Sequence, residues 1–449
     1  MTPEAAAAAG HSVIFGIDPL WLSTILLIVS YTVLLSEKFD RTVVALIGAG
    51  LVIITGVISQ EQAIEAIDFN TIALLTGMMI IVAITRTSGV FEFVAIWSAK
   101  KVNANPVGIL IVLSVVTAVF SAFLDNLTTV LLVVPIALLI VEKLEVSPYP
   151  FLFSQILASN IGGTATLIGD PPNILIGSAT GLTFMQFLTN LGPLVVVLIV
   201  IMVVVFKLLW GKGLMASEAA RQGIMRFREA ETITDKRLLV ISLTVLALVI
   251  AGFIVGEQYH IQPGTTAMFG AAVLVLATTF GASSHEQGEH LHHALIEVEW
   301  AALLFFIGLF IIVAGVEHAG LLNILGDQLI EFTGGDPART AYATLWLSAV
   351  VSAAVDNIPF VATMIPLVES METALGGPAQ LEPVWWALAL GACLGGNGSL
   401  VGAAANVMVS GLAGRAGHPI SFAKFMRIGL PLMLGTVAIA NVYMWLRYF

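Results

Sequence analysis

The chain has 449 residues, of which 58% are hydrophobic and only 10% are charged, and its formal net charge is −11. A soluble domain of this size would need about a quarter of its residues charged, so most of the surface must face lipid. The single cysteine excludes an intramolecular disulfide and a cysteine-based metal cluster, and no basic patch with interleaved aromatic residues suggests nucleic acid as a partner. The composition predicts an integral membrane protein embedded in the lipid bilayer, and no cofactor is expected.

Apolar segments in chain order predict the membrane spans, each of which needs about 20 apolar residues. Residues 1–19 are interpreted as a tail without a cleavable signal peptide, because no basic segment precedes their small-residue run. Simple spans are expected at residues 20–36, 42–59, 70–87, 186–207, 238–256, 264–282, 300–317 and 429–446.

Two longer apolar regions predict re-entrant hairpins that enter and leave the membrane on one side. Residues 107–141 are too long for one helix, and an Asp-Asn pair that begins at Asp125 interrupts them near the middle. Residues 342–368 repeat this pattern around the Asp-Asn pair that begins at Asp356. Each arm is then marginal for crossing the membrane but suitable for one limb of a hairpin.

Two Gly-rich regions, residues 150–180 and 384–411, predict helices that unwind at mid-membrane. Non-helical backbone at that depth is tolerated only where protein or a water-filled cavity satisfies its polar groups. Unwound helices of this kind are therefore expected to line a cavity.

The two halves of the chain repeat one another. SAFLDNLTTVLLVVPI from Ser121 aligns with SAAVDNIPFVATMIPL from Ser352, and NIGGTATLIGDPPNILI from Asn160 aligns with CLGGNGSLVGAAANVMV from Cys393. These blocks occur in the same order in both halves and indicate an internal duplication. Four glycines that also correspond between the halves are interpreted as packing glycines: Gly77, Gly89, Gly308 and Gly320.

Each half then contains three spans, a hairpin, a broken span and a last span, which makes five crossings, an odd number. The second half must therefore enter the membrane upside down, and inverted repeats with discontinuous helices are typical of secondary transporters. The predicted fold is an all-α polytopic membrane protein with two inverted-topology repeats, each with a re-entrant hairpin and a broken helix. Its expected segments are the tail 1–19, the first transport repeat 20–207, a linker 208–237 and the second transport repeat 238–449.

Lys and Arg residues predict the orientation of the chain. The linker 208–237 contains six of them, and placing it in the cytoplasm leaves few Lys or Arg residues in external loops. Both termini are then expected outside the cell (inner) membrane. The first hairpin would open inward and the second outward.

Three aspartates lie in the apolar regions and are the candidates for proton coupling: Asp356, Asp125 and Asp170. A central Asp costs about 2.5–3.5 kcal/mol on insertion, so it normally faces a cavity or a partner. The alternative is that these residues only cap helices, since Asp is a favoured N-cap. Asp125 is followed by Asn-Leu-Thr-Thr, which supplies two hydroxyls, whereas Asp356 is followed by Asn-Ile-Pro-Phe, which supplies none. Asp356 is therefore expected in the drier setting, as the carrier of the coupling proton, while Asp125 organises the substrate site.

Amide and hydroxyl side chains near these aspartates form the predicted substrate site. Adjacent glycines would let backbone N–H and C=O groups approach a small solute. The alternative role for such residues is helix packing through small side chains. The predicted substrate-binding residues are Asp125, Asn126, Thr128, Thr129, Asn160, Thr164, Thr166, Asn173, Asn357, Asn397, Ser399 and Asn406.

Both Asp-Asn hairpins and both Gly-Gly blocks, with GDPPN at residues 169–173 and GAAAN at residues 402–406, resemble the ArsB/NhaD ion-transporter superfamily. That superfamily includes arsenite permeases, Na⁺/H⁺ antiporters and the melanosomal P protein. The resemblance implies a core of hairpins and broken helices whose motif residues surround the substrate. The first acid–amide pair reads Asp-Asn, as in the P-protein type, whereas the best-known arsenite permeases have Asn-Asp.

The first expectation for function is proton-coupled efflux of arsenite or antimonite. Arsenite is mainly an uncharged trihydroxide at neutral pH, which amides, hydroxyls and backbone groups can bind. The lack of Lys or Arg near the motifs argues against di- and tricarboxylates. Na⁺/H⁺ antiport is the alternative, because ionised Asp125 and Asp356 with carbonyl groups would form a hard oxygen site.

The sequence lacks the motifs expected of ATP-driven transport or of a membrane-embedded enzyme. No P-loop is present, so an arsenite-stimulated ATPase would have to be a separate subunit. A membrane-embedded enzyme is disfavoured, because the chain has no GxSxG with a matching His and no HExxH motif. The sequence therefore favours a secondary active transporter.

Two lesser signals are a His-rich segment and the single cysteine. HEQGEHLHH at residues 285–293 is expected in an inside loop, either simply solvated or able to bind Zn²⁺ or Ni²⁺, and the solvated loop is favoured. Cys393 occupies the place of Asn160 in the repeat and is expected to border the site. Its thiol would be either a small buried filler or a soft ligand for As(III).

Overall fold

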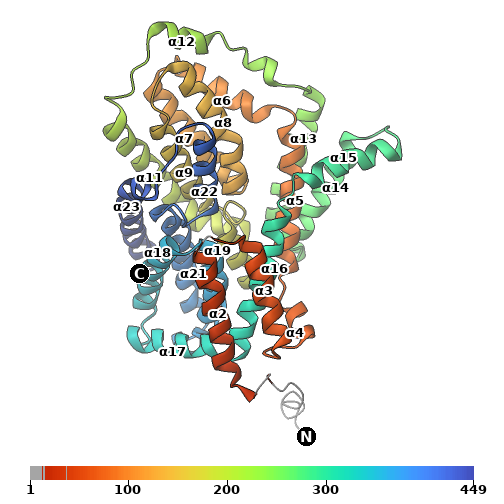
Figure 1. The fold of residues 1–449 in the computed structure, drawn as a ribbon, viewed down its shortest axis with the longest axis vertical. Coiled ribbons are helices and arrows are strands. Elements are labelled where there is room, and N and C mark those ends of the chain that lie inside the picture. Colours follow the sequence, from red (N-terminus) through yellow and green to blue (C-terminus); the bar gives the residue numbers. More distant parts are fainter. Residues whose placement is uncertain (1–12, 14–15, 37) are drawn as a thin grey trace.

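The computed structural model describes residues 13, 16–36 and 38–449, and within them it contains helices and no strands (Figure 1). Most of the predicted tail, residues 1–12, 14 and 15, lies outside the described residues. Among the described helices, seven are long and apolar enough to cross a membrane. The chain is an all-helical polytopic membrane protein, as predicted.

The helices of the first half follow the predicted order, and in the predicted span 42–59 the helix ends early, at Ile54. They are α2 (Pro19–Leu35), α3 (Arg41–Ile54), α4 (Gln60–Glu65), α5 (Phe69–Arg86), α6 (Val90–Lys101), α7 (Pro106–Phe123), α8 (Asn126–Leu144), α9 (Tyr149–Gly163), α10 (Pro171–Thr180) and α11 (Phe184–Trp210). The linker contains α12 (Glu218–Met225) and the short 3-10 helix η2 (Glu229–Thr232).

The second half repeats this order. Its elements are α13 (Lys236–Val255), η3 (Gly256–Tyr259), α14 (Pro263–Thr278), α15 (Ser284–Ile296), α16 (Trp300–His318), α17 (Leu321–Thr333), α18 (Pro337–Ala354), α19 (Asn357–Ser370), α20 (Glu372–Leu375), α21 (Pro378–Gly395), η4 (Gly396–Gly398), α22 (Ala404–Arg415) and α23 (Phe422–Tyr448).

The two hairpins form where short extended segments interrupt the long apolar regions. After α7, Leu124 is extended, and the Asp125 side chain accepts a hydrogen bond from the Thr128 N–H at 2.8 Å to start α8. Val355 and Asp356 repeat this arrangement between α18 and α19. The α7–α8 hairpin lies in the upper half of Figure 1 and the α18–α19 hairpin in the lower half, as expected for inverted repeats. Both predicted hairpins are present as helix pairs, and the two arms of the first, with 18 and 19 residues, are longer than expected.

The broken helices also form at the predicted places. In the first half α9 ends at Gly163 and α10 begins at Pro171; in the second half α21 ends at Gly395 and α22 begins at Ala404. Proline suits the first position of a helix, where its missing N–H leaves no hydrogen bond unmade. Residues 164–170, between α9 and α10, are all buried, so protein groups must satisfy this unwound backbone.

Several helices lie where the sequence predicted none, among them α6, α17 and the His-rich α15. Helices α6 and α17 have only 12 and 13 residues, which is shorter than a span. Each follows a glycine in the left-handed conformation, Gly89 with φ 78° and Gly320 with φ 86°, so both glycines start helices. The space beside Gly320 is open, so its predicted packing role is wrong, whereas Gly89 also lies against the backbone of the linker. The His-rich segment is helix α15 and not a loop, because Ser283 and Glu286 form a capping box that starts it.

The two repeats are interlocked. Helix α3 of the first repeat packs against α16 of the second, and α14 of the second packs against α5 of the first. The Thr42 hydroxyl donates to the Ala301 carbonyl at 2.9 Å across the first contact. The Gly264 N–H donates to Asn70 Oδ1 at 2.8 Å across the second.

Glycines permit these close contacts. A Cβ added at Gly308 would lie 2.7 Å from the backbone of Ala45, and one added at Gly77 would lie 2.5 Å from the backbone of Ala267. Small residues let helices approach closely in lipid, where van der Waals packing is a main source of association. The predicted packing role of Gly77 and Gly308 is confirmed.

The linker packs back onto the first repeat. Lys100 of α6 donates to the Phe227 carbonyl at 3.0 Å and to Glu229, and this ammonium group holds the pKa of Glu229 below its usual range. A Cβ at Gly89 would lie 1.8 Å from the Thr232 carbonyl oxygen, whereas the space beside Gly320 is open. The linker therefore contacts the start of α6, whereas the start of its counterpart α17 has no such neighbour at Gly320.

Candidate transport site

Helix N-termini from both repeats converge near the centre of the molecule. Asp125 precedes α8, Asp170 precedes α10, Asp356 precedes α19 and Ala403 precedes α22. Helix N-termini carry a partial positive charge, which favours carboxylates and other oxygen-rich groups nearby. The repeat thus places three aspartates and one alanine at equivalent helix starts.

Asparagine side chains join the repeats at this point. Asn160 Nδ2 donates to Asn397 Oδ1 at 3.0 Å and to Asn406 Oδ1 at 2.9 Å. Asn126 Nδ2 donates to Asn160 Oδ1 at 3.4 Å. The structure therefore brings together four residues that were predicted to share one site, three of them from broken helices and one from a hairpin tip.

Two of the predicted ligands hold the unwound backbone. Asn173 Nδ2 donates to the carbonyl groups of Thr164 and Thr166 at 3.2 and 2.9 Å. Asn406 Nδ2 donates to the carbonyl groups of Gly396 and Ser399 at 2.7 and 2.8 Å. Buried carbonyl groups are costly when unpaired, so these amides stabilise the breaks and have no donor left for a solute.

Some of the predicted hydroxyl groups are likewise hydrogen-bonded to the protein, and others are not. The Thr128 hydroxyl donates to Asp125, the Thr164 hydroxyl to the Asn160 carbonyl at 2.8 Å, and the Thr166 hydroxyl to the Ala122 carbonyl. These three groups are therefore engaged by the protein. The remaining predicted hydroxyls, on Thr129 and Ser399, are buried and have no hydrogen-bond partner among the described residues.

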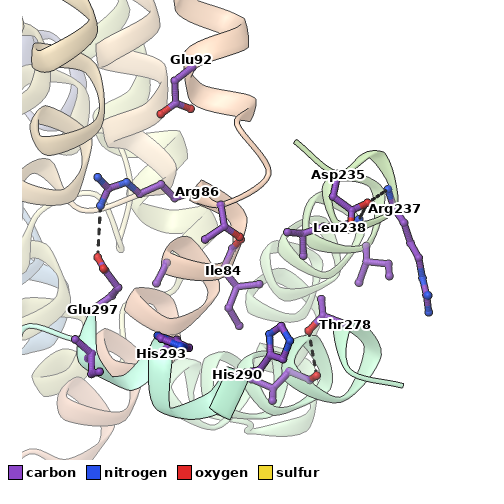
Figure 2. Close-up of a pocket in the computed structure, with 16 residues that line it drawn as sticks. Ile84, Arg86, Glu92, Asp235, Arg237, Leu238, Thr278, His290, His293 and Glu297 are labelled. Atoms are coloured by element: carbon purple, nitrogen blue, oxygen red, sulfur yellow. Dashed lines mark hydrogen bonds and ion pairs between the residues drawn. The ribbon is translucent and has the colours of Figure 1, made fainter. Parts of the chain in front are cut away.

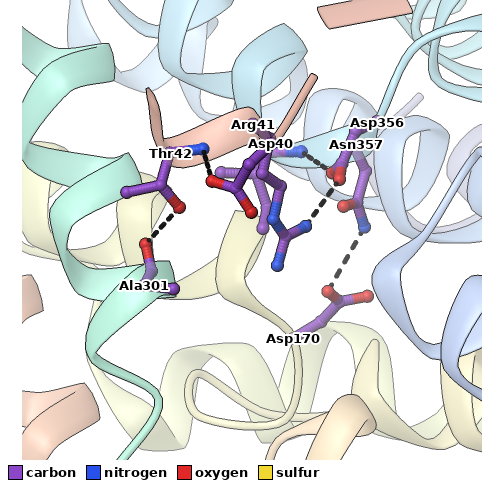
Figure 3. Close-up of polar contacts among 8 residues, drawn as sticks. Asp40, Arg41, Thr42, Asp170, Ala301, Asp356 and Asn357 are labelled. Carbon is purple, nitrogen blue, oxygen red and sulfur yellow. Dashed lines mark hydrogen bonds and ion pairs between the residues drawn. The ribbon is translucent and has the colours of Figure 1, made fainter. Parts of the chain in front are cut away.

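Asp170 is fully buried between the repeats. Its Oδ1 accepts a hydrogen bond from Asn357 Nδ2 at 3.3 Å (Figure 3), and its Oδ2 has no partner among the described residues. Asn397 Nδ2 is likewise buried without a partner in the described part of the chain. Unpaired buried polar atoms are rare and require an explanation, such as a ligand or a transferable proton.

The surroundings of Asp356 differ from the expectation. Its carboxylate lies 3.3 Å from the guanidinium of Arg41 and accepts a hydrogen bond from the Ile358 N–H at 3.1 Å (Figure 3). The predicted drier setting is wrong, because the Asp356 side chain lines a cavity that solvent can reach and α3 brings a positive charge to this tip. The premise that no Lys or Arg lies near the motifs is wrong for the same reason. Asp170 is the more deeply buried carboxylate.

A cavity of about 500 Å³ reaches both hairpin tips. Leu127 of the first tip and Asp356 of the second line it, together with Arg41, Glu299 and Arg415. Arg41 and Glu299 were not predicted as site residues, since each lies at the start of an ordinary apolar span. Solvent can therefore reach the second tip in this conformation, while Asp170 stays enclosed.

Cys393 lies beside the asparagine network, as expected from its place in the repeat. It is fully buried, and its thiol lies 3.5 Å from Asn173 Oδ1. The Asn160–Asn406 contact is the equivalent contact of the other repeat. The thiol therefore occupies the position of an amide.

The His-rich helix α15 borders a second cavity, of about 590 Å³ (Figure 2). His290 and His293 face it together with Arg86, Glu92 and Glu297. None of the described residues forms a group of three or more His, Cys, Asp or Glu side chains that could hold a metal ion. This cavity is separate from the hairpin tips.

Known proteins show the same fold and sequence pattern. An uncharacterized transporter of Mycobacterium tuberculosis is 43% identical, and the alignment covers 94% of this chain and 97% of that protein. Human P protein is 32% identical over 94% of this chain, which spans only 59% of that protein. The YdaH transporter of Alcanivorax borkumensis has a similar fold, with a TM-score of 0.61, 12% identity and coverage of 96% of this chain and 98% of that chain.

The family assignment follows from the sequence match. Residues 31–391 match the family described as citrate transporter. The resemblance to a transporter family that includes P protein is confirmed, whereas an affiliation with arsenite permeases or NhaD antiporters stays a prediction. The chain is a member of the citrate transporter family of membrane transporters.

Proposed function

We propose that the protein is a proton-coupled secondary transporter whose solute binds between the two hairpin tips and the two broken helices. The observation that carries the proposal is the enclosed carboxylate of Asp170, of which one oxygen has no hydrogen-bond partner among the described residues. An ionised carboxylate in such a place is costly unless it is paired. Binding and release of a proton at Asp170 would therefore be linked to the state of the site.

The charge of the site supports an uncharged or cationic solute. Asp125, Asp170, Asp356 and Glu299 outnumber the two guanidinium groups of the cavity, which belong to Arg41 and Arg415, and Arg41 already pairs with Asp356. Efflux of arsenite or antimonite, taken as the neutral trihydroxides, remains our first substrate proposal. The free groups suit it, because Ser399 and Thr129 can donate or accept hydrogen bonds and Asn397 Nδ2 can donate one. Na⁺/H⁺ antiport is the alternative.

Citrate is a second candidate, favoured by the description of the family and by the guanidinium of Arg41 at the cavity. Citrate carries several negative charges and would meet Asp356 and Glu299 in the same cavity. Like charges in close contact repel strongly in a medium of low dielectric constant. Citrate would therefore have to enter together with cations.

Flux into liposomes tests the proposal. Purified protein would be reconstituted, a pH gradient imposed, and the uptake of As(III), Na⁺ and citrate compared in parallel. With one proton per solute, a gradient of one pH unit should support up to about tenfold accumulation of As(III), and a protonophore should abolish it. Gradient-driven Na⁺ flux without As(III) flux would favour antiport. Citrate flux that requires a divalent cation would favour the second candidate.

The orientation is part of the proposal: α12 in the cytoplasm and both termini outside the inner membrane. It is supported by the Lys and Arg residues of the linker, and α12 and α17 lie at opposite ends of the molecule in Figure 1. In a Cys393→Ser background, Glu331→Cys on α17 should react with an impermeant thiol reagent added to intact cells. Ala219→Cys on α12 should react only after the cells are opened. Reaction of Ala219→Cys in intact cells would reverse the assignment.

A further inference from the structure

The two hairpin tips occupy equivalent positions in the repeat but differ in their counter-charge. Both hydrogen-bond donors to the Asp125 carboxylate, the N–H and the hydroxyl of Thr128, belong to its own hairpin. The Asp356 carboxylate instead pairs with Arg41, a residue of α3. Among the described residues, no Lys, Arg or His forms an ion pair with Asp125.

Arg41 is held by elements outside the hairpin that it serves. It is the first residue of α3, which Asp40 caps through the Thr42 N–H at 2.9 Å. Thr42 in turn bonds to α16, and the Arg41 guanidinium lies 5.4 Å from the ring centre of Phe305 on that helix. Arg41 therefore projects from the α3–α16 pair toward the tip of α19 (Figure 3).

The second repeat has no equivalent of this residue. Helix α14 corresponds to α3, because each is the second apolar helix of its repeat and the two pack against equivalent helices, α5 and α16. Helix α14 begins at Pro263, and its first turn, Pro-Gly-Thr-Thr, has no positive charge. The first tip thus lacks the built-in cation that the second tip has.

We propose that Arg41 is a tethered cation that takes the place of a mobile cation at the second hairpin tip and so confines the cation requirement of the site to the first repeat. A carboxylate at membrane depth needs a positive partner, a proton or a metal cation. Asp356 has its partner within the protein, so it needs none from solution. Asp125 and Asp170 have no such partner, and their charge is left for the coupling ion to neutralise.

The proposal rests on the proposed function, in which both tips belong to one transport site, and it adds a determinant of selectivity. With Arg41 present, Na⁺ cannot gain full access to Asp356, since the guanidinium already neutralises the carboxylate. Without Arg41, the second tip would present an unpaired carboxylate to a solvent-accessible cavity of about 500 Å³. Such a carboxylate would become a site for a hard cation.

The test is the effect of Na⁺ on the melting temperature of the purified protein. Wild type, Arg41→Gln, Arg41→Lys, Asp356→Asn and the double variant Arg41→Gln/Asp356→Asn would be compared in sodium chloride and in choline chloride. Arg41→Gln should melt lower than wild type in choline and recover with Na⁺, because Na⁺ then neutralises Asp356. Arg41→Lys and the double variant should show no more response to Na⁺ than wild type.

Arg415→Gln is the matched control, since Arg415 lines the same cavity but is not paired with Asp356. Its effect should add to that of Asp356→Asn, whereas the effects of Arg41→Gln and Asp356→Asn should be strongly non-additive. Additive effects at positions 41 and 356, or an Arg41→Gln variant that melts lower and does not respond to Na⁺, would overturn the proposal.

Melting does not depend on transport, so the two proposals can fail separately. If the wild-type protein moved none of the tested solutes, the proposed function would be refuted and the Na⁺ response of Arg41→Gln would still decide the role of Arg41. If transport is found, Arg41→Gln should make its rate newly dependent on Na⁺, and the double variant should lose that dependence.

Discussion

Asp170→Asn is expected to abolish gradient-driven transport while leaving the protein folded. The amide keeps the shape of the carboxyl group and an oxygen that can accept the hydrogen bond from Asn357 Nδ2, now 3.3 Å from Asp170 Oδ1. It cannot gain or lose a proton at neutral pH, so the link between the site and the pH gradient is removed. One proton moving down one pH unit contributes about 1.4 kcal/mol, and the variant should lose all of the resulting tenfold accumulation.

The measurement is uptake into liposomes with and without the gradient, together with solute binding in detergent. Asp327→Asn is the matched control, because Asp327 is an exposed aspartate on α17 outside the site. The control should keep wild-type accumulation. An Asp170→Asn protein that still concentrates solute against its gradient would eliminate Asp170 as the coupling residue and leave Asp125 as the candidate.

Gly162→Ala is expected to destabilise the protein more than an ordinary substitution in a helix. Gly162 lies on α9 where that helix crosses α7, and an added Cβ would fall 2.3 Å from the carbonyl oxygen of Ala118 and 2.5 Å from its Cα. These are backbone atoms, which cannot turn aside, so the two helices must separate. Overpacking of this kind costs about 1–3 kcal/mol, more than the gain of up to about 1 kcal/mol in helix propensity.

Thermal unfolding monitored by size-exclusion chromatography would measure the effect. Gly50→Ala is the control: Gly50 is also in a helix, and no atom lies within 4 Å of its added Cβ. Its melting temperature should stay the same or rise. Because Gly162 lies in the last turn of α9, two residues before the unwound segment begins, Gly162→Ala should also lower solute affinity. A variant with wild-type stability and affinity would contradict the close α7–α9 contact.

Much of the fold could be predicted because its interruptions are local. An Asp-Asn pair inside an apolar region of 35 residues cannot continue a spanning helix, and the same pair recurs in the second half. The Gly-Gly blocks predicted the broken helices for the same reason, because each is a local interruption of an apolar region that recurs in both halves. Helices α6 and α17 escaped prediction, since their 12 and 13 residues are too short to register as spans.

The candidate site was predicted in part. Asn160, Asn397 and Asn406 could be grouped from their equivalent positions in the repeat, and the structure brings them within hydrogen-bonding distance. Arg41 could not be assigned in this way. It lies 315 residues from Asp356 in the sequence, at the start of an ordinary span, and reaches the tip only because α3 packs against α16. The amide residues could therefore be predicted from local sequence motifs, whereas the cation beside Asp356 could be found only from the tertiary packing.

The interlocked repeats determine the order in which the protein can be completed during synthesis. Thr42 and its partner Ala301 are separated by 259 residues, so the face of α3 that receives α16 stays open to lipid until most of the chain has emerged from the ribosome. Exposure of the small side chains on that face to lipid costs little free energy, because they carry no unpaired charge. Arg41, at the end of the same helix, has no carboxylate from Asp356 until then. The packing of the first repeat is therefore completed only after the second repeat has been synthesised.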